Sequence, residues 1–347
     1  MRVVLSGLPF CGKSTVFKAL VGKEVQPKKA ASGKVQLNIG TLELKDQRLD
    51  KLAQILGSEK VTHPKINLID VAQVAEATAK GMDTTHIRDF DVLALVLAVF
   101  SSKDPKQDLR DIESDLILSD TQLVHNRVER IHKERKARPQ KEEDQELLLV
   151  ERCREVLEKE QMLKTLELKP DELKMLAGFQ FLTLKPMVLM ANVSEGQLNK
   201  EEFKDLEKAA QEKGMLFFSI CAKLEAEIEE LPEEERPEFL NSMGLAQLSG
   251  EGFIETCFQA RDDIFFFTVV GKEARAWPIG RGTQAVHAAG SVHTDMERGF
   301  IRAEVVNYKD FIECGSFTNA KEKGLLRLEG KEYIVQDGDI INFKFSV

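Results

Sequence analysis

The sequence predicts an α/β fold in which helices cover both faces of a parallel sheet, with a smaller β-rich domain at the C-terminal end. Two observations lead to this prediction. Short, almost continuous apolar segments alternate with segments whose apolar residues follow helical spacing, which is typical of a buried parallel sheet. From about Asp263 onward the pattern changes to short strands separated by glycine-rich turns.

Five apolar segments are expected to form the sheet. They are RVVLS (2–6), KINLID (65–70), VLALVLAVF (92–100), PMVLMAN (186–192) and MLFFSI (215–220). Between them, residues 46–56 and 200–214 carry apolar residues at helical spacing, and the second segment ends at Gly214, which suits a helix C-cap.

A charged insertion, residues 103–168, interrupts this alternation. From about Asp108 to Lys164 the sequence is helical with one break at 137–144, so we expect two antiparallel helices that share an apolar seam. The expected seam residues are Leu116, Leu123 and Ile131 before the break and Leu148, Val156, Leu157 and Leu163 after it. The first helix also carries the basic run Arg127, Arg130, Lys133, Arg135, Lys136 and Arg138. Such a run either contacts RNA phosphates or, more commonly, solvates an exposed helix face.

The patterns divide the chain into an N-terminal domain, 1–262, which contains the insertion, and a C-terminal domain, 263–347. Within the first, the acidic segment 225–238 is expected to be a solvated helical surface. In the second, FFFTVV, FIRAEVV and IINFKFSV are expected to be strands, and VQDGDI a turn.

Composition excludes several classes of protein. No apolar run in the 347 residues approaches the roughly 18 residues that a membrane span needs. The five cysteines form no CxxC pair, so neither a disulfide framework nor a zinc site is expected. The first residues form a strand-like segment without the stages of a signal peptide, so we expect a cytoplasmic protein. The net charge of −9 argues against attraction of the whole protein to nucleic acid, and DNA is not an expected partner.

The motif GLPFCGKS (7–14) predicts a phosphate-binding loop. Gly7, Gly12, Lys13 and Ser14 satisfy GxxxxGK[ST] between a strand and a helical segment. In that place backbone N–H groups wrap the phosphates of a nucleotide, the helix N-terminus adds a positive dipole, and the lysine reaches the terminal phosphates. The other residues expected to line the nucleotide site here are Phe10, Cys11 and Thr15.

Two oxygen-bearing residues are expected to hold Mg²⁺. Ser14 would ligate the ion, and Asp70, at the end of a buried strand, would contact it through water. An aspartate at a strand end is also a common helix cap. Because the sequence also contains a phosphate-binding loop, the metal role is favoured for Asp70. Lys13 and Asp70 are therefore the expected catalytic residues.

Two later segments are expected to recognise the base. Asn192, Val193 and Glu195 lie in NVSE, where guanine-nucleotide proteins carry NKxD, whose aspartate accepts hydrogen bonds from guanine. Valine and glutamate at these positions weaken guanine specificity, so adenine is the expected base. SICAK, with Cys221, Ala222 and Lys223, resembles the SAK loop that frames the base.

The chain resembles the YchF or Obg-like ATPase family almost from end to end. The resemblance lies in GLPFCGKST, NVSE, CAKLEAEIEEL, KEARAWPIGRGTQAVHAAGSVHTDMERGFIRAEVVNYKDF and LRLEGKEYIVQDGDIINFKF. It implies a P-loop G-domain, an inserted antiparallel coiled-coil hairpin and a C-terminal TGS domain of β-grasp form. It also implies slow hydrolysis with ATP preferred over GTP, and association with ribosomes in a role in translation or the stress response.

This chain departs from the family pattern in both switch regions and in the loop. Phe10 and Cys11 replace the Asn and Val of GLPNVGKST, which removes an amide near the phosphates. Gln73 replaces the glycine of DxxG, and a side chain restricts a backbone that must approach the γ-phosphate closely. Val74 keeps the family's apolar position, so Gln73 lies one residue too early to orient water. Lys34 stands near the switch threonine, with Ser32 the nearest hydroxyl.

Two functions remain open from the sequence. The first is a Mg²⁺-dependent NTPase, and the second is a nucleotide-dependent binding module or switch whose hydrolysis is vestigial. The intact loop fits both, while the altered switches favour the second. His293, Asp295 and Glu297 in HTDMERG are the alternative metal site, but as part of the C-terminal signature they are expected to be structural or to contact a partner.

Overall fold

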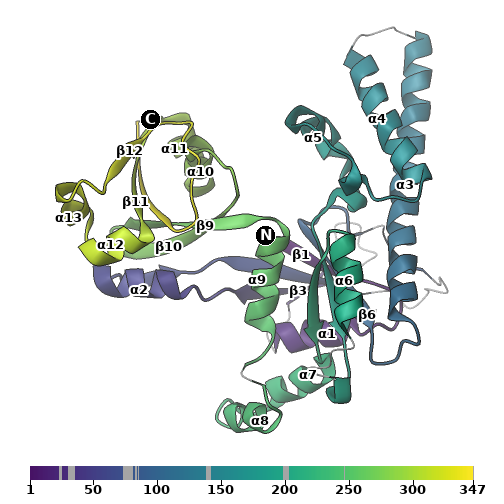
Figure 1. The fold of residues 1–347 in the computed structure, drawn as a ribbon, viewed down its shortest axis with the longest axis horizontal. Coiled ribbons are helices and arrows are strands. Elements are labelled where there is room, and N and C mark those ends of the chain that lie inside the picture. The colour runs from purple at the N-terminus through teal and green to yellow at the C-terminus, as the bar shows by residue number, and fades with distance from the viewer. Residues whose placement is uncertain are drawn as a thin grey trace. The chain divides into compact units, whose positions relative to one another are not determined.

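The structure is a computed structural model that describes residues 1–22, 26–29, 36–72, 81–82, 84, 86–137, 142–197, 203–245 and 247–346. It divides the chain into two compact units, Met1–Thr41 with Asn67–Gly250, and Leu42–Ile66 with Glu251–Val347. Figure 1 draws both as ribbons and labels many of their helices and strands. Within the described ranges, no helix combines the length and apolarity needed to cross a membrane.

The first unit is built on a seven-stranded sheet of order β2-β3-β5-β1-β6-β7-β8. Its strands are β1 (Arg2–Ser6), β2 (Gln26–Lys29), β3 (Gln36–Glu43), β5 (Lys65–Ala72), β6 (Val92–Ala98), β7 (Met187–Asn192) and β8 (Leu216–Ile220). β3 and β5 continue past the boundary between the units. β1, β5, β6, β7 and β8 run parallel, and β6 and β7 are buried on both faces almost throughout. The predicted apolar strands and the parallel sheet are confirmed.

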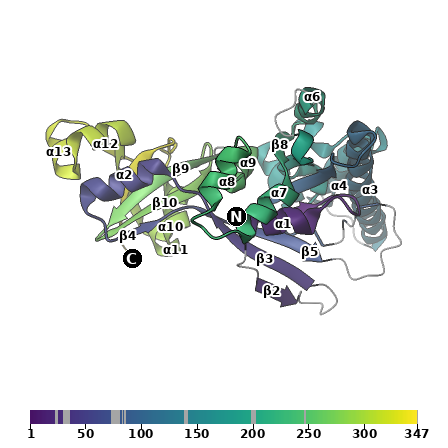
Figure 2. The ribbon, with the colours of Figure 1, turned by 90° about the horizontal axis from the view of Figure 1, so that it is seen from below.

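Helices surround this sheet. They are α1 (Lys13–Val21), α3 (Pro105–Ala137), α4 (Glu142–Glu158), α5 (Pro170–Leu176), α6 (Lys204–Glu212), α7 (Ala222–Glu230) and α8 (Arg236–Ser242), with short 3-10 helices η1 (Leu163–Thr165), η2 (Ala177–Phe179), η3 (Leu182–Leu184) and η4 (Glu195–Gln197). α1 packs against β1 and α7, whereas α3 packs against β6 and α6. Figure 2 shows α1 beside α7 from a second direction.

The predicted helical hairpin is formed by α3 and α4, which lie side by side in Figure 1. Leu116, Ile131 and Leu157 are buried as expected. Leu148 is the exception, because its side chain is 68% exposed. Leu147, Leu149, Val150, Cys153 and Leu157 of α4 are buried and lie on one side of the helix, and Leu148 lies on the opposite side. Leu163 is buried too, but in η1 rather than in the hairpin.

The hairpin arms are also joined by an ion pair. Arg127 of the predicted basic run donates from Nε and Nη2 to the two carboxylate oxygens of Glu146, each at 2.7 Å. This bidentate geometry fixes both side chains. Arg127 therefore helps to hold the arms together, while Lys133 is exposed and 3.5 Å from Glu129. Arg138 and the side chains of Arg135 and Lys136 lie outside the described residues.

The second unit contains a six-stranded mixed sheet of order β12-β11-β13-β9-β10-β4. Its elements are α2 (Gln47–Leu56), β4 (Lys60–Thr62), α9 (Gly250–Ala260), β9 (Asp263–Val270), β10 (Glu273–Gly280), α10 (Ala285–Val292), α11 (Thr294–Arg298), β11 (Phe300–Asn307), α12 (Tyr308–Cys314), α13 (Phe317–Glu322), β12 (Arg327–Glu329) and β13 (Asp339–Phe345). β9 and β10 form an antiparallel hairpin, and β13 pairs parallel to β9. The small β-rich domain expected from the pattern is confirmed, and its arrangement is the β-grasp form that the family resemblance implies.

Residues 42–66 and 251–262 fall in the second unit, although the predicted division placed them in the first domain. The reason lies in the apolar face of α2. Leu49 and Leu52 have no exposed surface and share a core with Phe267 and Phe311. β4 adds an edge strand by pairing with β10.

The acidic segment 225–238 is only partly a solvated surface. Glu225 is 4% exposed and accepts hydrogen bonds from the backbone N–H and the hydroxyl of Ser249. Burial raises the pKa of the Glu225 carboxyl, against the effect of these hydrogen bonds. The sequence predicted an exposed Glu225 because it lies in a run of acidic residues. Its hydrogen-bond partner, Ser249, is 24 residues away and is not apparent from the local pattern.

Candidate functional site

The loop between β1 and α1 has a backbone that requires glycine at two positions. Gly7 has φ +144°, and a Cβ there would lie 2.4 Å from the carbonyl oxygen of Val96. Gly12 has φ +89°, and its Cβ would lie 2.4 Å from Nδ2 of Asn192. Only glycine adopts such backbone angles without strain and leaves this space free. The loop then turns directly into α1, with Gly12 as its N-cap.

Lys13 folds its side chain back over the loop. Its ammonium donates hydrogen bonds to the carbonyl oxygens of Gly7, at 3.1 Å, and Leu8, at 2.9 Å. It also lies 3.6 Å from Sγ of Cys11. A positive charge is therefore held inside the turn of backbone that precedes α1, where it attracts an anion together with the helix N-terminus.

Ser14 and Asp70, the two residues expected to hold Mg²⁺, lie within hydrogen-bond distance of each other. Ser14 Oγ donates to Asp70 Oδ2 at 3.0 Å, and Asn38 Nδ2 donates to the same oxygen at 3.3 Å. Asp70 is 1% exposed, in β5, and pairs in register with Leu5 of β1. Parallel pairing of β5 with β1 thus carries the carboxylate to the helix that follows β1.

The donor set of this pair suits Mg²⁺. Magnesium prefers oxygen ligands and is usually held by one or two protein groups together with substrate phosphates and waters. Ser14 supplies a hydroxyl and Asp70 a buried carboxylate, and both lie beside the loop that would hold the phosphates.

Phe10 and Cys11, the two loop residues that depart from the expected GLPNVGKST pattern, differ in exposure. Phe10 is 95% exposed and has φ +63°, an uncommon angle for a residue with a side chain. Cys11 is 2% exposed. Burial raises the pKa of its thiol, although the nearby Lys13 ammonium acts in the opposite direction. Thr15 lies in the first turn of α1 and is partly buried.

Asn192 joins three loops at the expected base site. Its Nδ2 donates to the carbonyl of Cys11 at 3.1 Å, and its Oδ1 accepts from the N–H of Ala222 at 3.3 Å. Its own carbonyl accepts from the N–H of Phe100 at 3.0 Å. The NVSE and SICAK segments are therefore brought together against the phosphate loop, which the separation in sequence alone does not reveal.

The remaining predicted base-site residues differ in exposure. Val193 is buried, and its N–H bonds to the carbonyl of Ile220 at 2.9 Å. Cys221 and Ala222 are also buried, and burial raises the pKa of the Cys221 thiol. Glu195 and Lys223 are exposed. The side chains of Glu195 and Lys223 are thus accessible to a ligand. The buried Val193, Cys221 and Ala222 form the wall of the expected base site.

Phe100 is a residue of this region whose role sequence reasoning missed, because it was included in an apolar strand. β6 ends at Ala98, and Phe100 is 44% exposed beyond it. One edge of its ring, Cε1, is 3.9 Å from the place a Cβ would take on Gly12. An aromatic residue just past the end of a strand beside the loop was the available signal.

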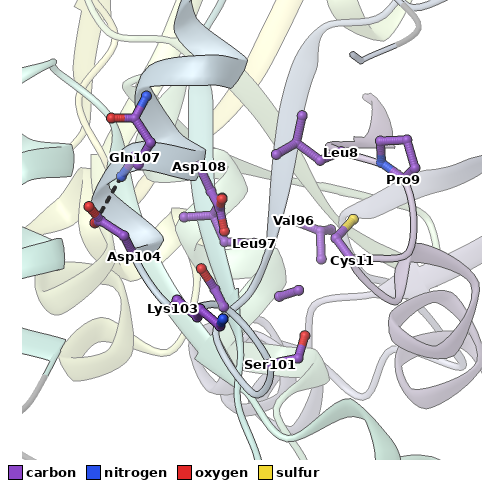
Figure 3. Close-up of a pocket in the computed structure, with 12 residues that line it drawn as sticks. Leu8, Pro9, Cys11, Val96, Leu97, Ser101, Lys103, Asp104, Gln107 and Asp108 are labelled. Carbon is purple, nitrogen blue, oxygen red and sulfur yellow. Dashed lines mark hydrogen bonds between the residues drawn. The ribbon is translucent and has the colours of Figure 1, made fainter. Parts of the chain in front are cut away.

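A pocket of about 390 Å³ opens beside the loop at the start of α3. Figure 3 shows Leu8, Pro9 and Cys11 on one side and Lys103, Asp104, Gln107 and Asp108 on the other. Asp104 caps the first turn there, because its Oδ1 accepts from the N–H of Gln107 at 3.1 Å. The hairpin helix therefore begins next to the phosphate loop.

The predicted switch residues cannot be placed, because Ser32, Lys34, Gln73 and Val74 lie outside the described residues. His293, Asp295 and Glu297 are described and have local partners. The Nδ1 atom of His293 accepts from the N–H of Asp295 at 3.2 Å, and Glu297 is 2.8 Å from His287. Within the described ranges, no three His, Cys, Asp or Glu side chains are grouped to hold a metal ion.

Comparisons with known proteins point to one family, from a family model of the C-terminal part and from relatives that cover almost the whole chain. The family model YchF-GTPase_C, described as a protein of unknown function (DUF933), matches residues 264–346. The protein named ribosome-binding ATPase YchF from Haemophilus ducreyi is 35% identical, and the one of that name from Bacillus subtilis is 34% identical; each match covers 98% of both chains. The solved YchF GTPase of Schizosaccharomyces pombe matches with a TM-score of 0.80 at 23% identity, covering 99% of this chain and 97% of that one.

Proposed function

Because this chain belongs to the YchF family, we propose that it binds a purine nucleoside triphosphate with Mg²⁺ and slowly hydrolyses the terminal phosphate, with ATP preferred over GTP. The observation that carries the proposal is the loop in which Gly7 and Gly12 permit a tight backbone turn packed against Val96 and Asn192, and in which Lys13 supplies the charge. Its relatives carry the name ribosome-binding ATPase, which agrees with this geometry.

In this mechanism the residues bind and neutralise rather than react. The loop N–H groups and Lys13 hold the β- and γ-phosphates, while Ser14 and Asp70 would hold Mg²⁺, which would neutralise charge on the phosphate oxygens. Phosphoryl transfer depends mainly on positioning and on electrostatic stabilisation of the transition state. Asp70 is well suited to this because its carboxylate is already oriented by Ser14 and Asn38.

Base preference follows from the wall next to the loop. The buried side chain of Val193 offers no hydrogen bond, and Glu195 replaces the aspartate that guanine requires. Phe100 is 44% exposed beside the loop, and an exposed aromatic ring can stack on any purine, so it does not select between the bases. Calorimetry with non-hydrolysable analogues is expected to show tighter binding of the ATP form. Tighter binding of the GTP form would contradict this assignment.

A nucleotide-dependent switch with vestigial hydrolysis is the second candidate, favoured by Gln73 and Lys34 in the switch sequences. Single-turnover hydrolysis with purified protein separates the two. We expect wild-type protein to hydrolyse ATP faster than Lys13→Ala. Equal rates, with ATP still bound, would leave the switch as the function.

We propose a cytoplasmic location and association with ribosomes through the hairpin and the C-terminal unit. Arg130 and Lys133 lie on the first arm, and Lys133 is exposed. Charge reversal at both positions is expected to weaken co-sedimentation with ribosomes, with Lys208→Glu on exposed α6 as the matched control. Unchanged sedimentation would remove the hairpin from the proposed interface.

A further inference from the structure

The pocket of about 390 Å³ beside the start of α3 is distinct from the loop surface that would hold the phosphates. It is lined by three loop residues, Leu8, Pro9 and Cys11, and by none of residues 12–15. Residues 96–98, at the end of β6, also line it. Its volume lies in the range of small-molecule sites, about 300–1,000 Å³. The pocket can therefore hold a ligand that does not compete with a nucleotide.

One wall of this pocket is apolar. Leu8 packs against the main core of the first unit and is half-buried, as are Pro9 and Ala98. The side chains of these three residues offer no hydrogen bond. This wall therefore suits an aliphatic part of a ligand.

The facing wall carries two free charges of opposite sign. Lys103 is exposed and Asp108 is half-buried, and both line the pocket. Within the described part of the chain, neither side chain has a hydrogen-bond or ion-pair partner. Asp104, by contrast, accepts from the N–H of Gln107 at 3.1 Å and lies 3.8 Å from Arg110. The wall therefore offers one ammonium and one carboxylate to a ligand.

Two hydroxyl groups stand next to the free ammonium. Ser101 and Ser102 directly precede Lys103, line the pocket, and have no side-chain hydrogen bond to any described residue. A hydroxyl can donate to a carboxylate, as an ammonium does. Residues 101–103 together thus form a place for a ligand carboxylate.

The arrangement of the two walls restricts the chemistry of the ligand. A ligand with only negative charge would meet the carboxylates of Asp104 and Asp108, and one with only positive charge would meet Lys103. Figure 3 shows Lys103 and Asp108 on the same side of the pocket, opposite Leu8 and Pro9. A complementary ligand therefore carries an ammonium and a carboxylate at one end and an apolar group at the other.

We infer that this pocket binds a free α-amino acid with an aliphatic side chain. The ammonium of the amino acid pairs with Asp108, and its carboxylate pairs with Lys103 and the hydroxyls of Ser101 and Ser102. Its side chain lies against Leu8 and Pro9. A peptide fits less well, because its two terminal charges lie at opposite ends of the molecule.

The test uses L-leucine as the probe and the full chain as the protein, with calorimetry and ligand-observed NMR as the measurements. Saturable binding of one leucine per chain is expected, with a Kd of about 1 mM, since a ligand of so few atoms gains limited binding energy. Three related compounds should each bind at least about fivefold more weakly. Leucine amide lacks the carboxylate, 4-methylpentanoate lacks the ammonium, and free glycine lacks the apolar group.

Substitutions in the charged wall test the assigned contacts. Asp108→Asn is expected to weaken leucine binding about tenfold, as loss of a charged hydrogen-bond partner does. Lys103→Gln should weaken it about threefold, because Lys103 is more exposed. Lys106→Gln and Asp205→Asn are the matched controls, since these residues form an exposed ion pair and do not line the pocket. Melting temperatures of all four variants should equal that of wild type.

Four results would each overturn the inference and leave the proposed nucleotide function intact. They are no saturable binding of leucine, equal affinity for leucine and for leucine amide or 4-methylpentanoate, unchanged affinity in Asp108→Asn, and displacement of leucine by a non-hydrolysable ATP analogue. The last result would place leucine in the nucleotide site.

Discussion

At the scale of single residues, Gly12 shows how one hydrogen atom in place of a methyl group shapes the site. We expect Gly12→Ala to force Asn192 out of its position, because its Nδ2 lies 2.4 Å from where the new Cβ would be. Asn192 would then lose its bonds to Cys11 and Ala222. The expected result, measured by calorimetry and urea unfolding, is at least about tenfold weaker ATP binding and a stability loss of about 1–3 kcal/mol.

Gly57→Ala is the matched control for this change. Gly57 also has positive φ, +62°, but nothing lies within 4 Å of its Cβ position. Gly57→Ala should lower the free energy of unfolding by about 1–2 kcal/mol, the cost of a left-handed backbone angle for alanine, and leave ATP affinity unchanged. Equal effects of the two substitutions on binding would show that the contact with Asn192 does not matter.

Lys164 gives stability a dependence on pH. Its Nζ is buried without a hydrogen-bond partner among the described residues, and burial lowers its pKa to about 8 from an ordinary 10.5. Below pH 8 both folded and unfolded chains are protonated, and the folded state bears the full cost of the buried charge. Between pH 8 and 10.5 the unfolded state binds more protons, so the free energy of unfolding rises with pH.

We therefore expect Lys164→Met to stabilise the protein at pH 7 by about 1–2 kcal/mol, a figure that allows for partial exposure. The gain should shrink toward pH 10. Urea unfolding of both proteins at pH 7, 8.5 and 10 measures it. A difference that stays constant with pH would mean that the charge of Lys164 is not the cause.

At the scale of elements, the pattern of apolar residues predicted the two helices of the hairpin but not which face of α4 is buried. The two helices and their break were predictable because long, strongly periodic segments are unambiguous. The orientation of α4 was not, because residues 147–150 are four consecutive apolar residues and any of them could face the partner. The structure buries Leu147, Leu149 and Val150 and exposes Leu148.

Two leucine-to-alanine substitutions in α4, one at a buried position and one at an exposed position, test this orientation. Leu157→Ala is expected to cost about 2–4 kcal/mol, since the side chain is 2% exposed and its removal leaves a cavity. Leu148→Ala, in the same helix, should stay within about 0.5 kcal/mol of wild type. Urea denaturation measures both, and a cost at Leu148 as large as at Leu157 would contradict the packing described here.

At the scale of the whole molecule, the sequence predicted a parallel sheet and a smaller β-rich domain. It did not predict which hydrophobic core each helix packs into. Spacing marked 46–56 as an amphipathic helix, yet nothing in that segment says that Leu49 and Leu52 pack with Phe267 and Phe311, more than 200 residues away. The site shows the same limit. Motifs identified Lys13, Ser14, Asp70 and Asn192, whereas Phe100 belongs to no motif, and its place beside Gly12 is visible only after the chain is folded.

A truncation series tests the unit boundaries. Residues 251–347 expressed alone should expose the apolar face that α2 covers and lose the pairing of β4 with β10. Joining residues 42–66 to them through a flexible linker is expected to raise the melting temperature by about 10 °C or more, because burial of two leucines is worth several kcal/mol. Binding of a hydrophobic dye should fall in parallel. Equal melting temperatures would show that 42–66 adds no stability to this unit.

The burial of Cys11 makes opening of the phosphate loop accessible to simple kinetics. A thiol that is 2% exposed, and whose pKa is raised, is alkylated only in those moments when the backbone around it separates. The rate of alkylation of Cys11, followed by mass spectrometry, thus reports how often the phosphate loop opens. No dye or isotope has to be introduced into the chain.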